Sequence, residues 1–135
     1  GLTARYYRGT KLVLETTEPP IYFEPFGWEP HAEKLAPHYK AEWSGFVQPP
    51  VSDRFQFRSL LGANEQLAVW IDGKIVHAAG LSKSVNEEVS LIAGHRHRIR
   101  IEYINPDGRA ELKLLWSSRI VDPVKVPKEV LYPEP

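Results

Sequence analysis

The stretch AGHRHRIRIEYINPDG, residues 93–108, decides the fold because its side chains alternate in character. Apolar or aromatic residues recur at every second position, and charged residues fill the positions between them. A period of two is typical of a β-strand, in which successive side chains point to opposite faces of a sheet. The expected inward face carries His97, Ile99, Ile101 and Tyr103, and the expected outward face carries Arg96, Arg98, Arg100 and Glu102.

Two other interpretations of this stretch are weaker. His95 and His97 share a face, as two metal ligands would, but no third donor lies near them in the sequence. The row of arginines would suit nucleic acid, but Glu102 interrupts it, and the chain balances 17 Lys and Arg against 17 Asp and Glu. We therefore interpret the stretch as a half-buried strand that leads into an NPDG turn, and we expect no nucleic-acid partner.

The composition limits the remaining possibilities. The 135 residues are enough for one domain with an apolar core. The absence of cysteine excludes disulfides, zinc–thiolate sites and thiol catalysis. No apolar run approaches the roughly 20 residues that span a bilayer, so we expect no membrane insertion. Because the chain has no methionine and no signal peptide, we expect it to be a domain excised from a longer protein.

The rest of the chain also favours strands over helices. Twelve prolines and nine glycines interrupt it, and the turn pairs Asp72-Gly73 and Ala93-Gly94 each predict a hairpin. A last edge pairing is expected from Val130 to Tyr132. We predict one all-β domain over residues 1–135, an antiparallel β-sandwich with little or no helix. The other alternating segments are YKAEWSGFV, RFQFRSLL, QLAVWI, KIVH, EEVSLI and RAELKLLWSS.

If successive strands run antiparallel, the loops around Asn64 and Asn105 and the loop from Ala78 to Asn86 share one rim. Binding residues on rigid β-scaffolds concentrate in such loops. The alternative is that Asn, Asp and Gly are present there only as turn formers. The candidate binding residues of the rim are Asn64, Glu65, Asn105, Asp107 and Arg109.

Signs of catalysis are missing. Ser44-Gly45 lies within an expected strand, whereas a nucleophile elbow needs a strand-to-helix turn. Glu87 and Glu88 are adjacent and point to opposite faces, so they cannot flank one glycosidic bond. There is no glycine-rich phosphate loop. We expect no enzyme activity from this chain itself, although a parent glycoside hydrolase remains open.

The segments SGFVQPPVSDRFQF, VWIDGKIV, VSLIAGHRHRIRIEY and AELKLLWSS resemble the PA14 domain family, as do the start GLTARYY and the end VPKEVLYP. This resemblance implies a β-sandwich module of toxins, glycosidases and adhesins, usually carbohydrate-binding. In the adhesin branch, two aspartates and an asparagine hold a sugar-bridging calcium ion. The aspartate pair falls here at Asn64-Glu65, and the asparagine falls at Asn105. With one carboxylate fewer, Ca²⁺ binding is expected to be weakened.

The resemblance leads to two hypotheses of function. The first is a non-catalytic carbohydrate-binding module of a secreted or cell-surface protein, such as a bacterial glycoside hydrolase or adhesin. Trp28 and Trp70 are its candidate stacking residues, and Trp70 is expected opposite Leu67, Val69 and Ile71. The simpler interpretation is that the proline-broken segment Leu12–Lys40 covers Trp70. The second hypothesis is a structural or protein-interaction module that packs on a neighbouring domain.

Overall fold

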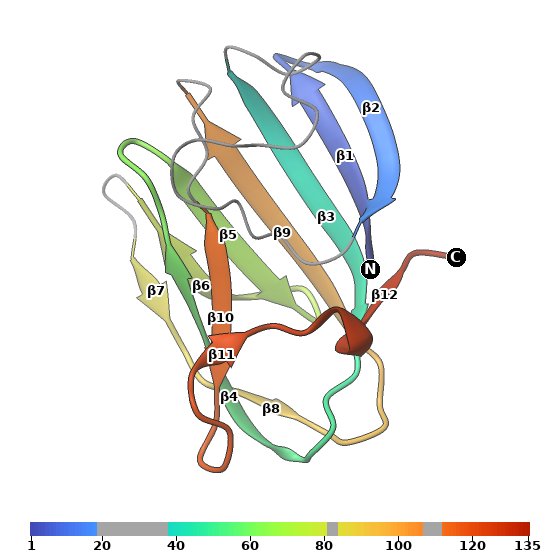
Figure 1. Ribbon diagram of the computed structural model, residues 1–135, viewed down its shortest axis with the longest axis vertical. Helices are drawn as coiled ribbons and strands as arrows, with labels where there is room; N and C mark the ends of the chain where they lie inside the picture. The colour runs from blue at the N-terminus through green and yellow to red at the C-terminus, as the bar shows by residue number, and fades with distance from the viewer. Residues whose placement is uncertain (19–37, 81–83, 107–111) are drawn as a thin grey trace.

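Two antiparallel sheets face each other in the computed structural model of the chain, which describes residues 1–18, 38–80, 84–106 and 112–135 (Figure 1). The larger sheet has the strand order β2-β1-β3-β9-β5-β6-β7, with β12 paired to β3. The smaller sheet has the order β11-β10-β4-β8. The predicted all-β, antiparallel sandwich is therefore confirmed.

The strand bounds follow the alternating segments closely. The described residues contain a single short 3₁₀ turn, Lys128–Val130. The larger sheet contains β1 (Leu2–Arg8), β2 (Lys11–Glu18), β3 (Tyr39–Val47), β5 (Gln66–Ile71), β6 (Lys74–Ala79), β7 (Val85–Asn86), β9 (His97–Asn105) and β12 (Leu131–Pro133). The smaller sheet contains β4 (Asp53–Leu60), β8 (Val89–Leu91), β10 (Lys113–Ser117) and β11 (Val124–Lys125).

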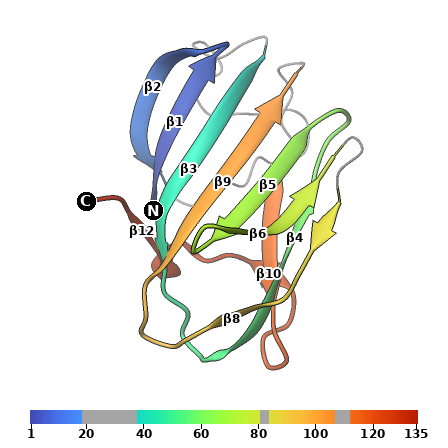
Figure 2. The same ribbon diagram turned by 180° about the vertical axis from the view of Figure 1, so that it is seen from behind.

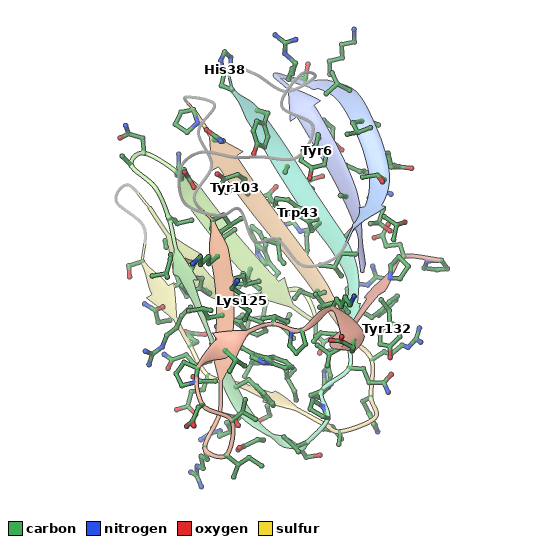
Figure 3. The ribbon with its side chains drawn as sticks, in the orientation of Figure 1. Tyr6, His38, Trp43, Tyr103, Lys125 and Tyr132 are labelled. Atoms are coloured by element: carbon green, nitrogen blue, oxygen red, sulfur yellow. The ribbon has the colours of Figure 1, made fainter. Side chains whose placement is uncertain are left out.

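The core lies between the sheets, where each strand turns its apolar face inward. On the larger sheet, Tyr6, Trp43 and Tyr103 project from β1, β3 and β9 toward the same space (Figure 3). Trp43 is fully buried, with its ring 5.9 Å from Tyr6 and 6.1 Å from Tyr103. On the smaller sheet, Phe55 packs 4.5 Å from Trp116. The apolar positions of the alternating pattern thus form the core, and the polar positions form the surface.

The predicted hairpin through Ala93-Gly94 is wrong. The turn itself exists, since Gly94 has a positive φ of 78° and His95 N–H donates to the Ile92 carbonyl. However, β8 pairs with β4 in the smaller sheet, while β9 pairs with β3 and β5 in the larger one. The turn is bonded to the β3–β4 connection, where Ser52 Oγ accepts from Ala93 N–H at 2.8 Å. Turn residues indicate a reversal of the chain, but they do not say which sheet the next strand joins.

The hairpin at Asp72-Gly73 has the expected conformation. Both residues have positive φ, 50° and 83°, and β5 and β6 pair across them. The Asp72 carboxylate also accepts from the Arg98 backbone N–H at 3.0 Å, which ties this turn to β9.

The first and last strands lie against the same neighbour. β1 pairs with β3 from Thr3 onward, and β12 pairs with the other end of β3, from Val47 to Gly45. The N-terminal ammonium donates to the Leu131 carbonyl at 3.0 Å, so the two ends of the chain lie close together (Figure 1). The expected pairing of Val130 to Tyr132 is therefore found as β12, shifted by one residue.

Candidate functional site

The rim predicted by counting strands exists. Gln66, at the start of β5, lies opposite Ile104, near the end of β9. The Asn64-Glu65 pair that precedes β5 is therefore next to Asn105, and Ala79, at the end of β6, lies opposite Leu67 at the same edge. Two loops that are about 40 positions apart in the sequence thus meet, as expected for antiparallel strands.

Two of the rim residues are buried. Glu65 is 2% exposed and Asn105 is 0% exposed. The Tyr103 hydroxyl donates to Glu65 Oε1 at 2.7 Å, which anchors the rim to the aromatic core. Asn64 is exposed and has a left-handed φ of 65°, a conformation that asparagine tolerates better than most residues. The geometry of Asn64, Glu65 and Asn105 fits a structural turn. That these residues bind a sugar or a metal ion stays a prediction.

The described rim donors fit a calcium ion poorly. Calcium takes about six to eight oxygen ligands, and its affinity rises with the number of carboxylates. The three described candidates supply one carboxylate, of which one oxygen already accepts the Tyr103 hydroxyl. Among the described residues, no group of three His, Cys, Asp or Glu side chains could hold a metal ion. Asp107, Arg109 and Trp28 lie outside the described residues.

Trp70 lies on the outward face of the larger sheet, opposite the core (Figure 2 looks onto this face). Its neighbours Val69 and Ile71 are buried, whereas Trp70 is half-buried, as the alternation predicted. The guanidinium of Arg100 lies 4.0 Å from the centroid of the Trp70 ring. This cation–π contact orients the indole without removing it from the surface.

Two shallow hollows meet at Trp70. The first, of about 210 Å³, is lined by Trp70, Ala68, Ile75 and Glu102 among others, and its exposed surface is mostly apolar. The second, of about 200 Å³, is lined by Trp70, Arg100 and Ser44 among others. Trp70 therefore forms part of the wall of both hollows.

Arg100 connects this tryptophan to a network of charged groups on β9 and β3. Together they form what we call the Trp70 cluster: Lys40, Glu42, Trp70, Arg100 and Glu102. Glu42 and Glu102 lie directly opposite each other on β3 and β9. Lys40 Nζ lies 3.1 Å and Arg100 Nη1 lies 3.3 Å from Glu102 Oε1. The same two cations lie 3.7 and 3.8 Å from Glu42. Each cation thus bridges two carboxylates that would otherwise repel each other.

The pKa values follow from this pairing. Burial alone raises the pKa of Glu102, but the hydrogen bond and charge of Lys40, with the charge of Arg100, outweigh it and lower this pKa below its ordinary value. The hydrogen bond to Glu102 raises the pKa of Lys40. The pairing therefore favours the charged forms of Glu102 and Lys40, and the formal charges of the two acids and two bases of the cluster cancel.

Two more arginines, Arg98 of β9 and Arg96 just before this strand, stack on rings from neighbouring strands. Arg98 lies 5.1 Å from the Phe46 ring centroid and Arg96 lies 4.0 Å from that of Tyr132. The alternating pattern alone predicted only a solvated face for these arginines. The missed signal is that Phe46 and Tyr132 also fall on outward positions of strands that pair with one another.

His97 is held between two turns. Its Nε2 accepts from the Ile92 backbone N–H at 3.1 Å, so Nδ1 carries the proton toward Asp72 Oδ2 at 3.0 Å. Both ring nitrogens are occupied, and His95 lies in the preceding turn rather than in β9. The two histidines do not form a metal site.

His77 links the two sheets, a role that its position in the sequence does not indicate. It is 4% exposed, and its Nδ1 lies 3.0 Å from Asn86 Oδ1, so this nitrogen donates to the amide oxygen. Nε2 then accepts from the Ser59 hydroxyl of β4 at 2.7 Å. Burial lowers the pKa of His77 and keeps the ring neutral. The order Ser–His–Asn is that of a hydrolytic triad, but here the chain of hydrogen bonds joins β4 to β6 and β7 across the sandwich.

The chain belongs to the PA14 domain family, whose model matches residues 1–129. It is 27% identical to the anti-sigma-I factor RsgI3 of Acetivibrio thermocellus over 98% of this chain, and it spans 21% of that protein. It matches a solved anti-sigma factor domain-containing protein of Clostridium clariflavum with a TM-score of 0.84 and 27% identity, over 100% of this chain and 47% of that one.

A more distant match is the epithelial adhesin 6 A domain of Candida glabrata, solved in complex with Galb1-3GlcNAc. Its TM-score is 0.75 at 16% identity, over 99% of this chain and 87% of that one, which is a likeness of fold. Among the described residues, no helix is long and apolar enough to cross a membrane.

Proposed function

We propose that this domain is a non-catalytic carbohydrate-binding module and that the Trp70 cluster is its contact surface. The observation that carries the proposal is a half-buried tryptophan, oriented by Arg100 at 4.0 Å and bordered by two hollows. An aromatic ring that is amphipathic, rigid and accessible is a frequent anchor of binding surfaces.

The chemistry of the cluster matches that of a sugar ring. A pyranose has an apolar face of C–H groups, which packs on an indole, and a rim of hydroxyls, which both donate and accept hydrogen bonds. Glu42 and Glu102 supply acceptors, and Lys40 and Arg100 supply donors, all held in place by mutual ion pairs. Because these four charges cancel, the surface suits a neutral glycan better than a polyanion.

Binding without turnover is part of the proposal. A glycosidase that uses two carboxylates needs one of them protonated, with a raised pKa. The pKa of Glu102 is lowered instead, and Glu42 shares its cations. The pair therefore supports hydrogen bonding to hydroxyls rather than proton transfer.

The similar proteins support a proposal about where this domain is located and what kind of protein contains it. An adhesin with this fold was solved with a disaccharide bound, and two relatives are described as anti-sigma factor proteins. We propose a secreted or cell-surface location, with the domain as one part of a longer protein.

The test is retention on immobilised or gel-embedded neutral polysaccharides, among them β-glucan, xylan and mannan. Trp70→Ala is expected to weaken retention by about tenfold or more, equivalent to about 1.4 kcal/mol. The matched control is Phe46→Ala, which removes another outward ring capped by an arginine and is expected to retain binding. Failure of the natural chain to bind any of these glycans, or equal binding by Trp70→Ala, would refute the proposal.

A second measurement, with and without calcium, distinguishes binding at the Trp70 cluster from binding at the rim. Because the Trp70 cluster uses no metal, retention is expected to be the same with added calcium and with a chelator. Loss of retention in the chelator alone would move the binding site to Asn64, Glu65 and Asn105 and away from Trp70.

A further inference from the structure

The outward face of the smaller sheet differs from the Trp70 cluster in its charges. The outward positions of β4, β10 and β11 alternate with buried Phe55, Phe57 and Trp116. They include cations and aliphatic side chains, and none is a carboxylate. We call this surface the basic face, and it contains Arg54, Arg58, Leu60, Lys113, Leu115 and Lys125.

The register interleaves its apolar and charged groups. Leu115 lies opposite Arg58 on one side and opposite Lys125 on the other, and Lys113 lies opposite Leu60. Since neighbouring strands are about 4.8 Å apart, Arg58 and Lys125 stand about 10 Å apart across Leu115. Leu60 is 56% exposed, and Lys125 lies on the near side of the molecule in Figure 3.

Among the residues that the structure describes, the cations of β4 and β10 lack acidic partners. Within the described part of the chain, Arg54, Arg58 and Lys113 make no ion pair, whereas Lys40 and Arg100 each make two. Glu88, which precedes β8 at the edge of this sheet, is exposed and makes none either. The charge of Arg54, Arg58 and Lys113 is therefore left uncompensated, unlike that of Lys40 and Arg100.

We infer that the basic face docks an acidic segment of a protein, in which carboxylates alternate with apolar side chains. The carboxylates would pair with Arg58, Lys113 and Arg54, and the apolar side chains would cover Leu115 and Leu60. Arginine is enriched at protein interfaces, and its aliphatic stem can lie along apolar surface while its charged group stays in water. The described outward positions of this sheet carry no aromatic ring on which a sugar or a base could stack, which disfavours a glycan or a nucleic acid.

The test uses the whole chain and a fluorescein-labelled peptide in which glutamates alternate with leucine and serine, followed by fluorescence anisotropy. Arg58→Glu and Lys113→Glu are each expected to weaken peptide binding by about tenfold, because attraction becomes repulsion. The matched control is Lys74→Glu, which makes the same change of charge at the tip of the β5–β6 hairpin, where Lys74 is 75% exposed. It is expected to change binding by less than about twofold.

Other outcomes would overturn the inference. Equal losses in Arg58→Glu and Lys74→Glu would mean that only net charge attracts the peptide. Tighter, Arg58-dependent binding of polygalacturonate or single-stranded DNA would assign the face to a different class of ligand. Binding of the peptide with glutamine in place of glutamate, at the same affinity, would exclude charge complementarity. Unchanged thermal unfolding of Arg58→Glu checks that the variant is folded.

Discussion

On the outward face of the larger sheet, each cation of the Trp70 cluster lies within 3.8 Å of a carboxylate, whereas on the smaller sheet Arg54, Arg58 and Lys113 make no ion pair within the described residues. Both faces come from the same alternation of inward and outward side chains. The two faces differ in the register of their paired strands, which decides which outward side chains become neighbours. β3 and β9 bring Glu42, Glu102 and their two cations together, while β4 and β10 bring Arg58 beside Leu115.

The comparison teaches that a balanced composition can conceal an uneven surface. The chain contains equal numbers of acidic and basic residues, 17 of each. The zero net charge argues against general attraction to polyanions, but it does not describe either face. One face offers polar groups whose charges cancel, and the other offers positive charge, so the two faces suit different partners.

The largest expected effect is on stability, and it distinguishes the paired cations of the Trp70 cluster from the unpaired cations of the basic face. The double variant Lys40→Gln, Arg100→Gln leaves Glu42 and Glu102 opposite each other without cations and removes the contact with Trp70. We expect the free energy of unfolding to fall by about 2 kcal/mol, because repulsion across the pair is added to the lost ion pairs and cation–π contact. Urea denaturation measures it.

The matched variant on the basic face is Arg58→Gln, Lys113→Gln. Because these cations have no carboxylate partner among the described residues, the expected change is within about 0.5 kcal/mol. If both double variants lose the same stability, the distinction between paired and unpaired cations is wrong.

The next largest effect is the salt dependence of binding, which is expected to differ between the two faces. Raising sodium chloride from about 0.1 M to about 1 M shortens the screening length from about 10 Å to about 3 Å. Binding of the acidic peptide to the basic face is expected to weaken by about tenfold, and polysaccharide retention is expected to change by less than about twofold. Anisotropy and affinity electrophoresis at both salt concentrations give the two values. A strong salt dependence of glycan retention would mean that the charges of the Trp70 cluster are not compensated when ligand binds.

The smallest expected effect concerns His77, whose hydrogen bonds connect the two sheets. Because burial lowers its pKa in the folded state below the ordinary 6.5, the unfolded chain takes up a proton more readily. Stability is therefore complete above the ordinary pKa and is lost as the pH falls through it. We expect a loss of about 1 kcal/mol between about pH 7 and about pH 5.5, with a slope of at most about 1.4 kcal/mol per pH unit.

Chemical denaturation across this range, compared with His77→Gln, isolates the effect. The variant is less stable at neutral pH because Ser59 and Asn86 lose their partner, and it lacks the His77 part of the slope. An identical pH slope in both proteins would exclude His77 as its source. The low pKa of Glu102 acts in a separate window, below its ordinary 4.5.

Much of the fold could be predicted because it depends on local alternation. The buried positions of β4, β5 and β9 were readable from the period of two, and the positive φ of Asp72-Gly73 was readable from its residue types. In β3 the period failed at Ser44, which falls on the outward face of the alternation but is buried. Antiparallel order alone brought Asn64 and Asn105 to one rim. Trp70 was correctly assigned to the outward face because it alternates with Val69 and Ile71.

Features that depend on contacts between distant segments were beyond the sequence. The Ala93-Gly94 turn predicted a hairpin, but the strand after it joins the other sheet. The burial of Glu65 follows from the Tyr103 hydroxyl, 38 positions away, and the position of His77 follows from Ser59 on the opposing sheet. The partition of charge between the faces depends on inter-strand register, which an alternating pattern leaves open.

The meeting of the two chain ends at β3 sets how the domain would be tethered. Glu134 N–H donates to Thr3 Oγ1 at 3.0 Å, so the ends leave the sheet side by side, away from the rim of Asn64 and Asn105. Tension between the ends would load the hydrogen bonds of β1 and β12 to β3 before it reached β5 or the smaller sheet. Trp70 on β5 and the basic face on the smaller sheet would thus lie outside the strands that bear the force first.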